Sequence, residues 1–250
     1  MHLWVILALA GFAAGVINAI AGGGSLVSFP ALLLTGVPAV TANATNTVAI
    51  WPGSLSSVWA YRDYVKEERH RAVVLAWPSL VGGLAGSVIL LHTSERSFRA
   101  IVPWLILFAC ALMLLQGPVS RLVVRRAIEG ARHVPASLWV AQLLISIYGG
   151  YFGAGIGILM LAATAIFMPD SLQHANGLKV LFAMLINGIA AVYFLVVGAA
   201  DLPAAALMAV ASLAGGYAGA RLAQKLPPPL MRGAVIAYGT AVAVYLLRTG

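Results

Sequence analysis

Charged residues are scarce in this sequence. Asp, Glu, Lys and Arg together account for 9% of its 250 residues, while 62% of the residues are hydrophobic. A soluble domain carries about a quarter charged residues, so this composition excludes an ordinary soluble protein. It predicts an all-α polytopic membrane protein.

Carboxylates are absent from the long apolar segments. Proton-coupled transporters usually rely on intramembrane carboxylates, and hard cations need oxygen anions as ligands. The sequence therefore argues against a carboxylate proton relay, and neither a metal site nor a cofactor is expected. The seven acidic residues all fall in predicted turns or at predicted helix ends: Asp63, Glu67, Glu68, Glu95, Glu129, Asp170 and Asp201.

Cysteine is nearly absent, and basic residues are missing from the N-terminus. The single cysteine, Cys110, excludes an internal disulfide, and we interpret it as a small core residue. No Lys or Arg precedes the first apolar run, whereas a signal peptide needs a positively charged start. Residues 1–20 are therefore predicted to remain as a helix of the mature protein.

The net charge of +8 is concentrated in a few places. Most basic residues lie in two predicted loops, 62–71 and 121–132, and a third group flanks the prolines at 227–229. Lys and Arg beside apolar segments mark cytoplasmic loops. The charge therefore reports membrane topology, and a lipid bilayer rather than a nucleic acid is the expected partner.

Glycines interrupt the apolar sequence at two places. Residues 21–25 read Ala-Gly-Gly-Gly-Ser, and residues 149–157 hold five glycines. Each glycine inside a helix costs about 1 kcal/mol relative to Ala, so the chain is predicted to break at both places, with Ser25 capping the next helix. Unwound backbone survives in a bilayer only where it lines a cavity or is buried in protein. Such breaks point to a transport site.

The two halves of the chain resemble each other. Ala42-Asn43 corresponds to Ala175-Asn176, and the glycines at 82–86 correspond to those at 215–219. Both pairs are separated by the same distance along the chain, which we call the repeat offset. The sequence therefore predicts two transmembrane repeats, residues 1–116 and 135–250, joined by a basic cytoplasmic linker at 117–134.

The apolar segments define the expected membrane crossings. Residues 26–36 and 156–168 are too short to span, because a full span needs about 20 residues, and we interpret each as the second arm of a glycine-hinged hairpin. Each repeat then contains one hairpin plus three spanning helices, the last of the first repeat at 98–116. The count is eight to ten crossings. The segments run at 3–20, 26–36, 39–60, 72–92, 98–116, 136–152, 156–168, 172–198, 203–223 and 230–247.

The basic loops orient these segments. With 61–71 and 117–133 in the cytoplasm, the first half starts outside and the second starts inside, which makes two inverted-topology repeats. Both chain termini are then expected outside. The expected location is the plasma membrane, the inner membrane of a bacterium.

Lys179 is the one cation inside an apolar run. Its side chain could snorkel to the lipid headgroups, or it could be the counter-charge for an anion. Two half-helix N-termini are expected at a similar depth, and these ends carry partial positive charge and free N–H donors. The three together form a plausible anion cradle.

Small polar residues open the segment that follows each hairpin. Five of them lie at 41–47, more than one helix cap requires, so we expect one face to line a cavity; Asn187 is a further counterpart in the second half. His174 is interpreted as a capping or interfacial residue, with titration as the alternative. The predicted substrate-binding set is Gly23, Gly24, Ser25, Asn43, Asn46, Thr47, Gly155, Gly157, Asn176 and Lys179.

These motifs, in this order, resemble the sulfite exporter TauE/SafE family of membrane transporters over almost the whole chain. The resemblance implies transport, usually outward, of a small sulfur-containing anion such as sulfite, a sulfonate or a sulfoacetate-like acid. The motifs that carry it lie at 18–25, 29–30, 42–47, 51–54, 153–157, 176–179 and 215–219.

Other functions remain open at this point. The same scaffold could carry another small organic or inorganic anion, or serve as a receptor or assembly subunit. Ser25 and His174 superficially suggest the dyad of an intramembrane serine hydrolase, but Leu26 stands where such proteases need glycine. We therefore expect a transporter and not an enzyme. The oligomeric state is left open.

Overall fold

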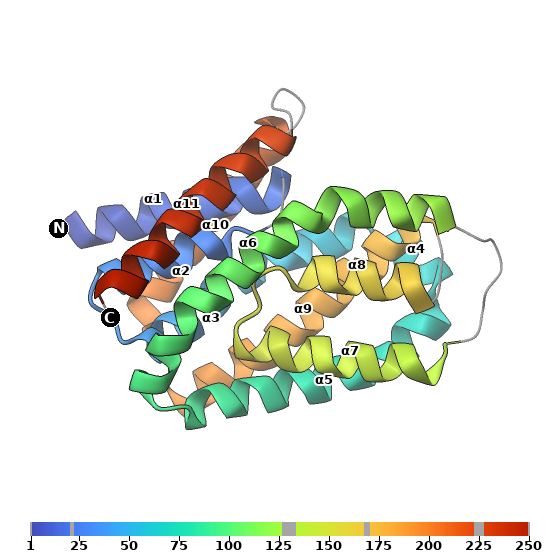
Figure 1. Ribbon diagram of the computed structural model, residues 1–250, viewed down its shortest axis with the longest axis horizontal. Helices are drawn as coiled ribbons and strands as arrows, with labels where there is room; N and C mark the ends of the chain where they lie inside the picture. The colour runs from blue at the N-terminus through green and yellow to red at the C-terminus, as the bar shows by residue number, and fades with distance from the viewer. Residues whose placement is uncertain (1, 21–22, 127–133, 168–170, 223–227, 250) are drawn as a thin grey trace.

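The fold is a bundle of helices (Figure 1). The computed structural model describes residues 2–20, 23–126, 134–167, 171–222 and 228–249, and none of these residues forms a strand. The first half contains α1 (His2–Ile20), α2 (Ser25–Leu34), α3 (Ala39–Ala60), α4 (Arg62–Glu67), α5 (Arg69–His92) and α6 (Glu95–Arg126). The second half contains α7 (Ala136–Tyr151), α8 (Ile156–Phe167), α9 (Leu172–Val197), α10 (Leu202–Leu222) and α11 (Pro228–Thr249).

Five helices in the described part of the chain are long and apolar enough to cross a membrane: α5, α6, α9, α10 and α11. α3 is long enough, with 22 residues, but it is not among the five. α2 and α8 are short apolar helices of 10 and 12 residues, as the hairpin interpretation requires. The prediction of an all-α polytopic membrane protein is confirmed.

The first helix break lies where the glycines predict it. Gly23 has φ +88°, a left-handed conformation that glycine adopts without strain. The amide of Gly24 donates to Asn18 Oδ1 at 2.7 Å, so Asn18 binds a backbone group released by the break. The prediction that Ser25 caps α2 is wrong. Gly24 occupies the N-cap position without a side-chain cap, and Ser25 is the first helical residue.

The second break repeats this design with different residues. Gly153 and Gly155 have φ +82° and +80°, and α8 begins directly after them. The Tyr148 hydroxyl donates to the carbonyl oxygen of Ala154 at 2.7 Å. Each break is therefore held by a side chain from the helix that precedes it, Asn18 in α1 and Tyr148 in α7.

Glycines bring two pairs of helices into close contact. A Cβ at Gly215 of α10 would lie 2.0 Å from the carbonyl oxygen of Phe12 in α1, and one at Gly82 of α5 would lie 2.7 Å from that of Leu143 in α7. Gly82 and Gly215 are related by the repeat offset, and Phe12 and Leu143 miss that relation by only two positions. The same packing thus occurs at closely corresponding places in the two halves. Gly216 differs, because a Cβ there would meet nothing within 4 Å.

Two predicted boundaries are corrected by the structure. α6 was expected to end at residue 116 but continues to Arg126, so the predicted linker begins inside a helix; residues 127–133 lie outside the described part. The predicted loop at 61–71 contains α4. Pro118 lies inside the carboxyl-terminal part of α6.

The helix ends gather at two opposite ends of the molecule (Figure 1). The start of α1 and the end of α11 share one end, where the amide of Val40 in α3 donates to Glu95 Oε2 of α6 at 3.1 Å. The opposite end holds α4, the start of α7 and the start of α9. The outer ends of the α1–α2 hairpin lie at the first end, and those of the α7–α8 hairpin at the second.

Candidate functional site

A central cavity of about 840 Å³ lies between the two helix breaks. Its walls come from α1, α3, α6, α9 and α10. The first break contributes Gly23 and Ser25, and the second contributes residues 153–158. The lining includes Asn18, Gly23, Ser25, Ile50, Ser54, Ser57, Tyr61, Gln116, Gly155, Gly157, Lys179, Ala183, Asn187, Ser212 and Gly216.

Helix starts face this cavity. Ser25 is the first residue of α2, and Gly157 is the second residue of α8. The first-turn N–H groups of a helix have no partner one turn earlier, and they carry partial positive charge. At the start of α8 the amides of Ile156 and Ile158 donate to the carbonyl oxygens of Gly153 and Gly155, so the glycine amides beside them are the donors left for a ligand. Gly155 and Gly157 themselves carry no side chain that would cover these donors.

Lys179 is the single charged side chain among the described residues that line the cavity. It lies about two turns into α9, and its ammonium donates to Asn176 Oδ1 at 2.8 Å. A Cβ at Gly157 would lie 3.0 Å from Lys179 Cδ, so the lysine stem packs directly on the start of α8. An ammonium and the N-terminus of a helix thus lie together.

The two halves contribute equivalent positions to the walls. Ser54 of α3 and Asn187 of α9 both line the cavity and are related by the repeat offset, as are Ile50 and Ala183. The residue equivalent to Lys179 is Asn46. Among the described lining residues, the second half alone therefore supplies a cation.

The remaining predicted residues lie behind the wall. Asn46 accepts a hydrogen bond of 2.5 Å from Ser28 of α2. Asn43, 1% exposed, donates through Nδ2 to the carbonyl oxygen of Tyr151 at 2.9 Å, and its backbone carbonyl oxygen accepts from Thr47 Oγ1. These groups join α3 to α2 and α7.

The structure thus divides the predicted set. Gly23, Ser25, Gly155, Gly157 and Lys179 line the cavity, and Asn176 binds Lys179 without lining it. The others are packed between helices: Gly24, Asn43, Asn46 and Thr47.

Several polar lining residues were not in the predicted set. Ser54 could have been found by applying the repeat offset to Asn187. Gln116 of α6 gives no such signal. Its Oε1 is buried and has no hydrogen-bond partner among the described residues, and this acceptor lies at the cavity wall.

A cluster of aromatic side chains lies between the cavity and the start of α6. Phe29 packs edge-on against Phe98 and Phe152, with ring centroids 6.5 and 5.5 Å apart. Tyr151 packs against Phe98 at 5.6 Å. The cavity extends instead to Tyr61, at the end of α3 beside α4.

His174 lies in the first turn of α9, where Ser171 and not His174 is the capping residue. Its amide donates to Ser171 Oγ, the N-cap of α9, at 3.2 Å. Its Nδ1 lies 2.7 Å from Ser171 Oγ, and its Nε2 lies 2.7 Å from Glu67 Oε2 of α4. Both ring nitrogens are therefore engaged away from Ser25, and the geometry gives no Ser/His dyad.

Comparison with known proteins decides the family. The family model described as sulfite exporter TauE/SafE matches residues 7–246. The chain belongs to the TauE/SafE family.

Relatives agree with this assignment. A "Probable membrane transporter protein" of Haemophilus influenzae is 30% identical over 241 residues, covering 94% of this chain and 91% of the relative. The "Probable membrane transporter protein ORF9" of Sinorhizobium sp. is 26% identical, covering 98% and 93%. The "Probable membrane transporter protein YfcA" of Escherichia coli K12 is 25% identical, covering 94% and 86%. This TauE/SafE protein is therefore a multi-pass membrane transporter and not an enzyme.

Proposed function

We propose that this TauE/SafE protein exports a small sulfur-containing anion, such as sulfite, a sulfonate or a sulfoacetate-like acid, by alternating access. The observation that carries the proposal is the position of Lys179, the lone charge among the described residues of a cavity that the starts of α2 and α8 face. The family name supports a sulfur-containing substrate. The expected location is the bacterial inner membrane, with the α4 end in the cytoplasm and both chain termini outside.

The proposed binding site combines three donors. Lys179 supplies the charge, the start of α8 supplies N–H groups beside Gly155 and Gly157, and Ser25 supplies a hydroxyl from the first break. A sulfite or sulfonate group carries three oxygens and can accept from all three sides. Charge-assisted hydrogen bonds of this kind are roughly twice as strong as neutral ones.

Alternating access requires two arrangements of the same helices. In the structure the cavity extends toward α4, while Phe29, Phe98 and Phe152 fill the other side. The hairpins at opposite ends and the repeated glycine contacts support an inverted repeat, in which exchanging the conformations of the halves opens the opposite side. The cavity described here then corresponds to the inward-facing state.

The electrical gradient favours the proposed direction. A cell interior is negative, so export of an anion is favoured by about 2.3 kcal/mol per charge per 100 mV. The cavity wall contains no Asp or Glu among its described residues, so it offers no carboxylate for a proton relay. Facilitated efflux is therefore the simplest mechanism.

Counterflow in proteoliposomes tests the proposal. Vesicles loaded with sulfite take up labelled sulfite through the protein, and external sulfite, sulfate, sulfoacetate and a carboxylate such as acetate compete. We expect sulfite or sulfoacetate to compete most strongly. Stronger competition by sulfate or acetate would assign another anion to the same site, and no counterflow with any of the four would overturn the anion assignment.

A further inference from the structure

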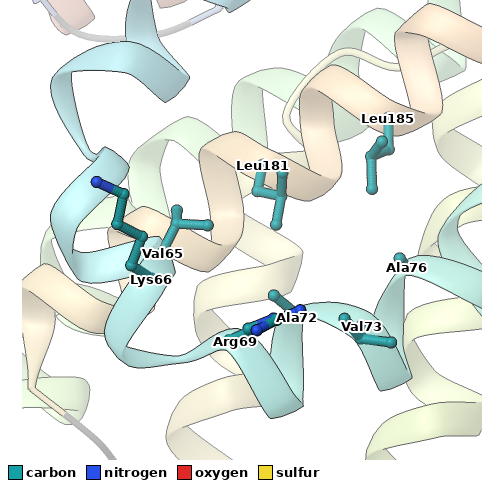
Figure 2. A pocket seen from close by; sticks show the side chains of 8 residues that line it. All are labelled: Val65, Lys66, Arg69, Ala72, Val73, Ala76, Leu181 and Leu185. Atoms are coloured by element: carbon teal, nitrogen blue, oxygen red, sulfur yellow. The ribbon is translucent and has the colours of Figure 1, made fainter.

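A second concavity lies on the outer surface, between α4, α5 and α9 (Figure 2). It is a groove of about 620 Å³, and it shares no lining residue with the central cavity. One end is basic and the rest is apolar. Nothing in the proposed transport mechanism uses it.

The apolar part of the groove is built from small residues on one helix and large ones on the other. Ala72 and Ala76, one turn apart on α5, form one side. Leu181 and Leu185, one turn apart on α9, form the other and point toward α5 (Figure 2). The missing side-chain volume at the two alanines leaves a channel along the helices, of a shape that suits a flexible hydrocarbon chain.

The charged end lies at the junction of α4 and α5. Arg69, the first residue of α5, and Lys66 of α4 line it, and both are exposed. No ion pair of Arg69 is found among the described residues. Lys66 Nζ lies 3.6 Å from Asp63 Oδ1 in a pair that is open to solvent, and such pairs contribute little.

The neighbouring acids Glu67 and Glu68 contact residues outside the groove lining. Glu67 contacts His174 at 2.7 Å, and Glu68 binds Arg71 at 2.7 Å in a nearly buried pair. The groove itself is lined by no Asp or Glu among its described residues. Its charged end is therefore free to accept an anion.

We propose that this groove binds one anionic phospholipid of the bilayer. The phosphate lies between Lys66 and Arg69, and one acyl chain follows the channel between the alanines and the leucines. Basic residues at a membrane surface attract anionic lipids, and Arg binds phosphate through two parallel N–H donors. The groove presents both parts of such a lipid in the right order, with the charge at the helix ends and the apolar channel toward mid-membrane.

A second copy of the chain is a poorer occupant. In a two-fold dimer the same patch lies on both sides of the interface, so Lys66 and Arg69 of one copy would face the same cations of the other. No acid lines the described part of the groove to compensate for this repulsion. The charge pattern therefore favours a lipid.

Native mass spectrometry of the full-length protein in detergent tests the proposal. Phosphatidylglycerol and phosphatidylcholine with identical acyl chains are titrated separately, and the masses distinguish bound lipid from dimer. We expect tighter binding of phosphatidylglycerol, and a roughly 10- to 30-fold loss of that affinity in Lys66→Gln/Arg69→Gln. The matched control is Arg121→Gln/Arg125→Gln, which removes two exposed cations from α6 and should keep the wild-type affinity.

A variant of the apolar channel distinguishes lipid binding in the groove from a purely long-range electrostatic attraction of the lipid. Ala76→Phe should fill the channel and weaken phosphatidylglycerol binding, while Ala111→Phe at an exposed position of α6 should not. Both variants are first checked for a wild-type elution profile. Equal affinity for the two lipids, equal losses in the α4/α5 and α6 charge variants, unchanged binding in Ala76→Phe, or a dimer in place of bound lipid would each overturn the proposal.

Discussion

Lys179 is the residue on which the proposed chemistry depends. It lines the cavity, donates to Asn176, and packs its stem on Gly157. A lysine that snorkels would extend to the membrane surface instead. Its place in the cavity wall therefore supports a role as a counter-charge.

Replacing Lys179 tests this role. Lys179→Met keeps most of the stem but removes the charge, and we expect anion affinity to fall by roughly 10- to 100-fold, since a hydrogen bond to a charged group contributes about 1.5–3 kcal/mol. Lys179→Arg should retain part of the affinity. The measurement is the concentration of sulfite that half-saturates counterflow.

Arg121→Met is the control for overall charge, because Arg121 is exposed on α6 outside the cavity. It should leave the half-saturating concentration unchanged. Similar losses in Lys179→Met and Arg121→Met would remove Lys179 from the site.

The sequence predicted the residues that line the cavity better than it separated them from the polar residues packed behind the wall. The glycines and Lys179 could be found, because unwound backbone and a lone cation are anomalous in an apolar chain. The cluster at 41–47 could not be resolved into wall and packing, since Asn43 and Asn46 are as polar as a ligand would require yet bind Tyr151 and Ser28. Only tertiary contacts separate these two roles.

At the scale of elements, the helix breaks are the parts that form the cavity. Gly155 has φ +80°, and a Cβ there would lie 3.0 Å from Leu112 Cδ1. A side chain at this position is strained by the backbone and also occupies the approach to the start of α8. A side chain at Gly155 should therefore lower stability through backbone strain and, as a separate effect, lower transport by occupying this approach.

Gly155→Leu and Gly198→Leu form a matched pair. Gly198 also has positive φ, +71°, but lies in the turn after α9 with nothing within 4 Å of its Cβ position. Both variants should lower the melting temperature, because a left-handed conformation costs an L-residue roughly 1–2 kcal/mol. Only Gly155→Leu should also reduce counterflow, on the order of 10- to 100-fold.

Thermal unfolding and counterflow on the same preparations distinguish the outcomes. Counterflow that falls equally in both variants would mean that backbone strain alone is responsible. Wild-type counterflow in Gly155→Leu would show that the second break does not contact the substrate.

The contact between α1 and α10 gives a second matched pair. Gly215→Ala places a Cβ 2.0 Å from the carbonyl oxygen of Phe12, while Gly216→Ala places one in open space. We expect Gly215→Ala to destabilise the protein by about 1–3 kcal/mol, the usual cost of overpacking. Gly216→Ala should be neutral or stabilising by up to about 1 kcal/mol from helix propensity.

Melting temperatures in detergent measure this difference. Equal values for the two variants would mean that α1 and α10 separate easily. The correspondence between the glycines at 82–86 and 215–219 gives no means of distinguishing Gly216, which lines the cavity. Adjacent residues on a helix point about 100° apart, so one can pack while the other faces a void.

At the scale of the whole molecule, the cavity lies toward one end, and an aromatic cluster lies toward the other. The cavity reaches Tyr61 beside α4, and the cluster around Phe98 fills the opposite side. In the proposed orientation, which follows the positive-inside rule, the α4 end faces the cytoplasm. Reagents should therefore reach the cavity from the cytoplasm in this state.

Cysteine labelling tests that orientation. In a Cys110→Ala background, which removes the single native thiol, Ser57→Cys places a thiol on the cavity wall, and Phe98→Cys places one in the closed side. A membrane-impermeant maleimide should label the Ser57→Cys variant in inside-out vesicles much faster than in right-side-out vesicles. The Phe98→Cys variant should react slowly in both.

Faster labelling of the Ser57→Cys variant from the outside would invert the predicted topology.

The sequence alone predicted the helical class and the hairpins, because hydropathy and glycine act on local structure. It misplaced the end of α6, at residue 116 instead of Arg126, because basic residues in a helix that continues past the bilayer have the same composition as a loop.

The difference between Lys179 and Asn46 makes the duplicated halves non-interchangeable. A chimaera of two first halves would have a cavity wall without an ammonium group. A chimaera of two second halves would place a second ammonium at the position of Asn46, which is 2% exposed and lies beside Ser28. The described contacts of Asn46 include no carboxylate that would offset the desolvation of this charge. If the halves are repeats, as proposed, each now depends on the other, one for neutral packing and the other for charge.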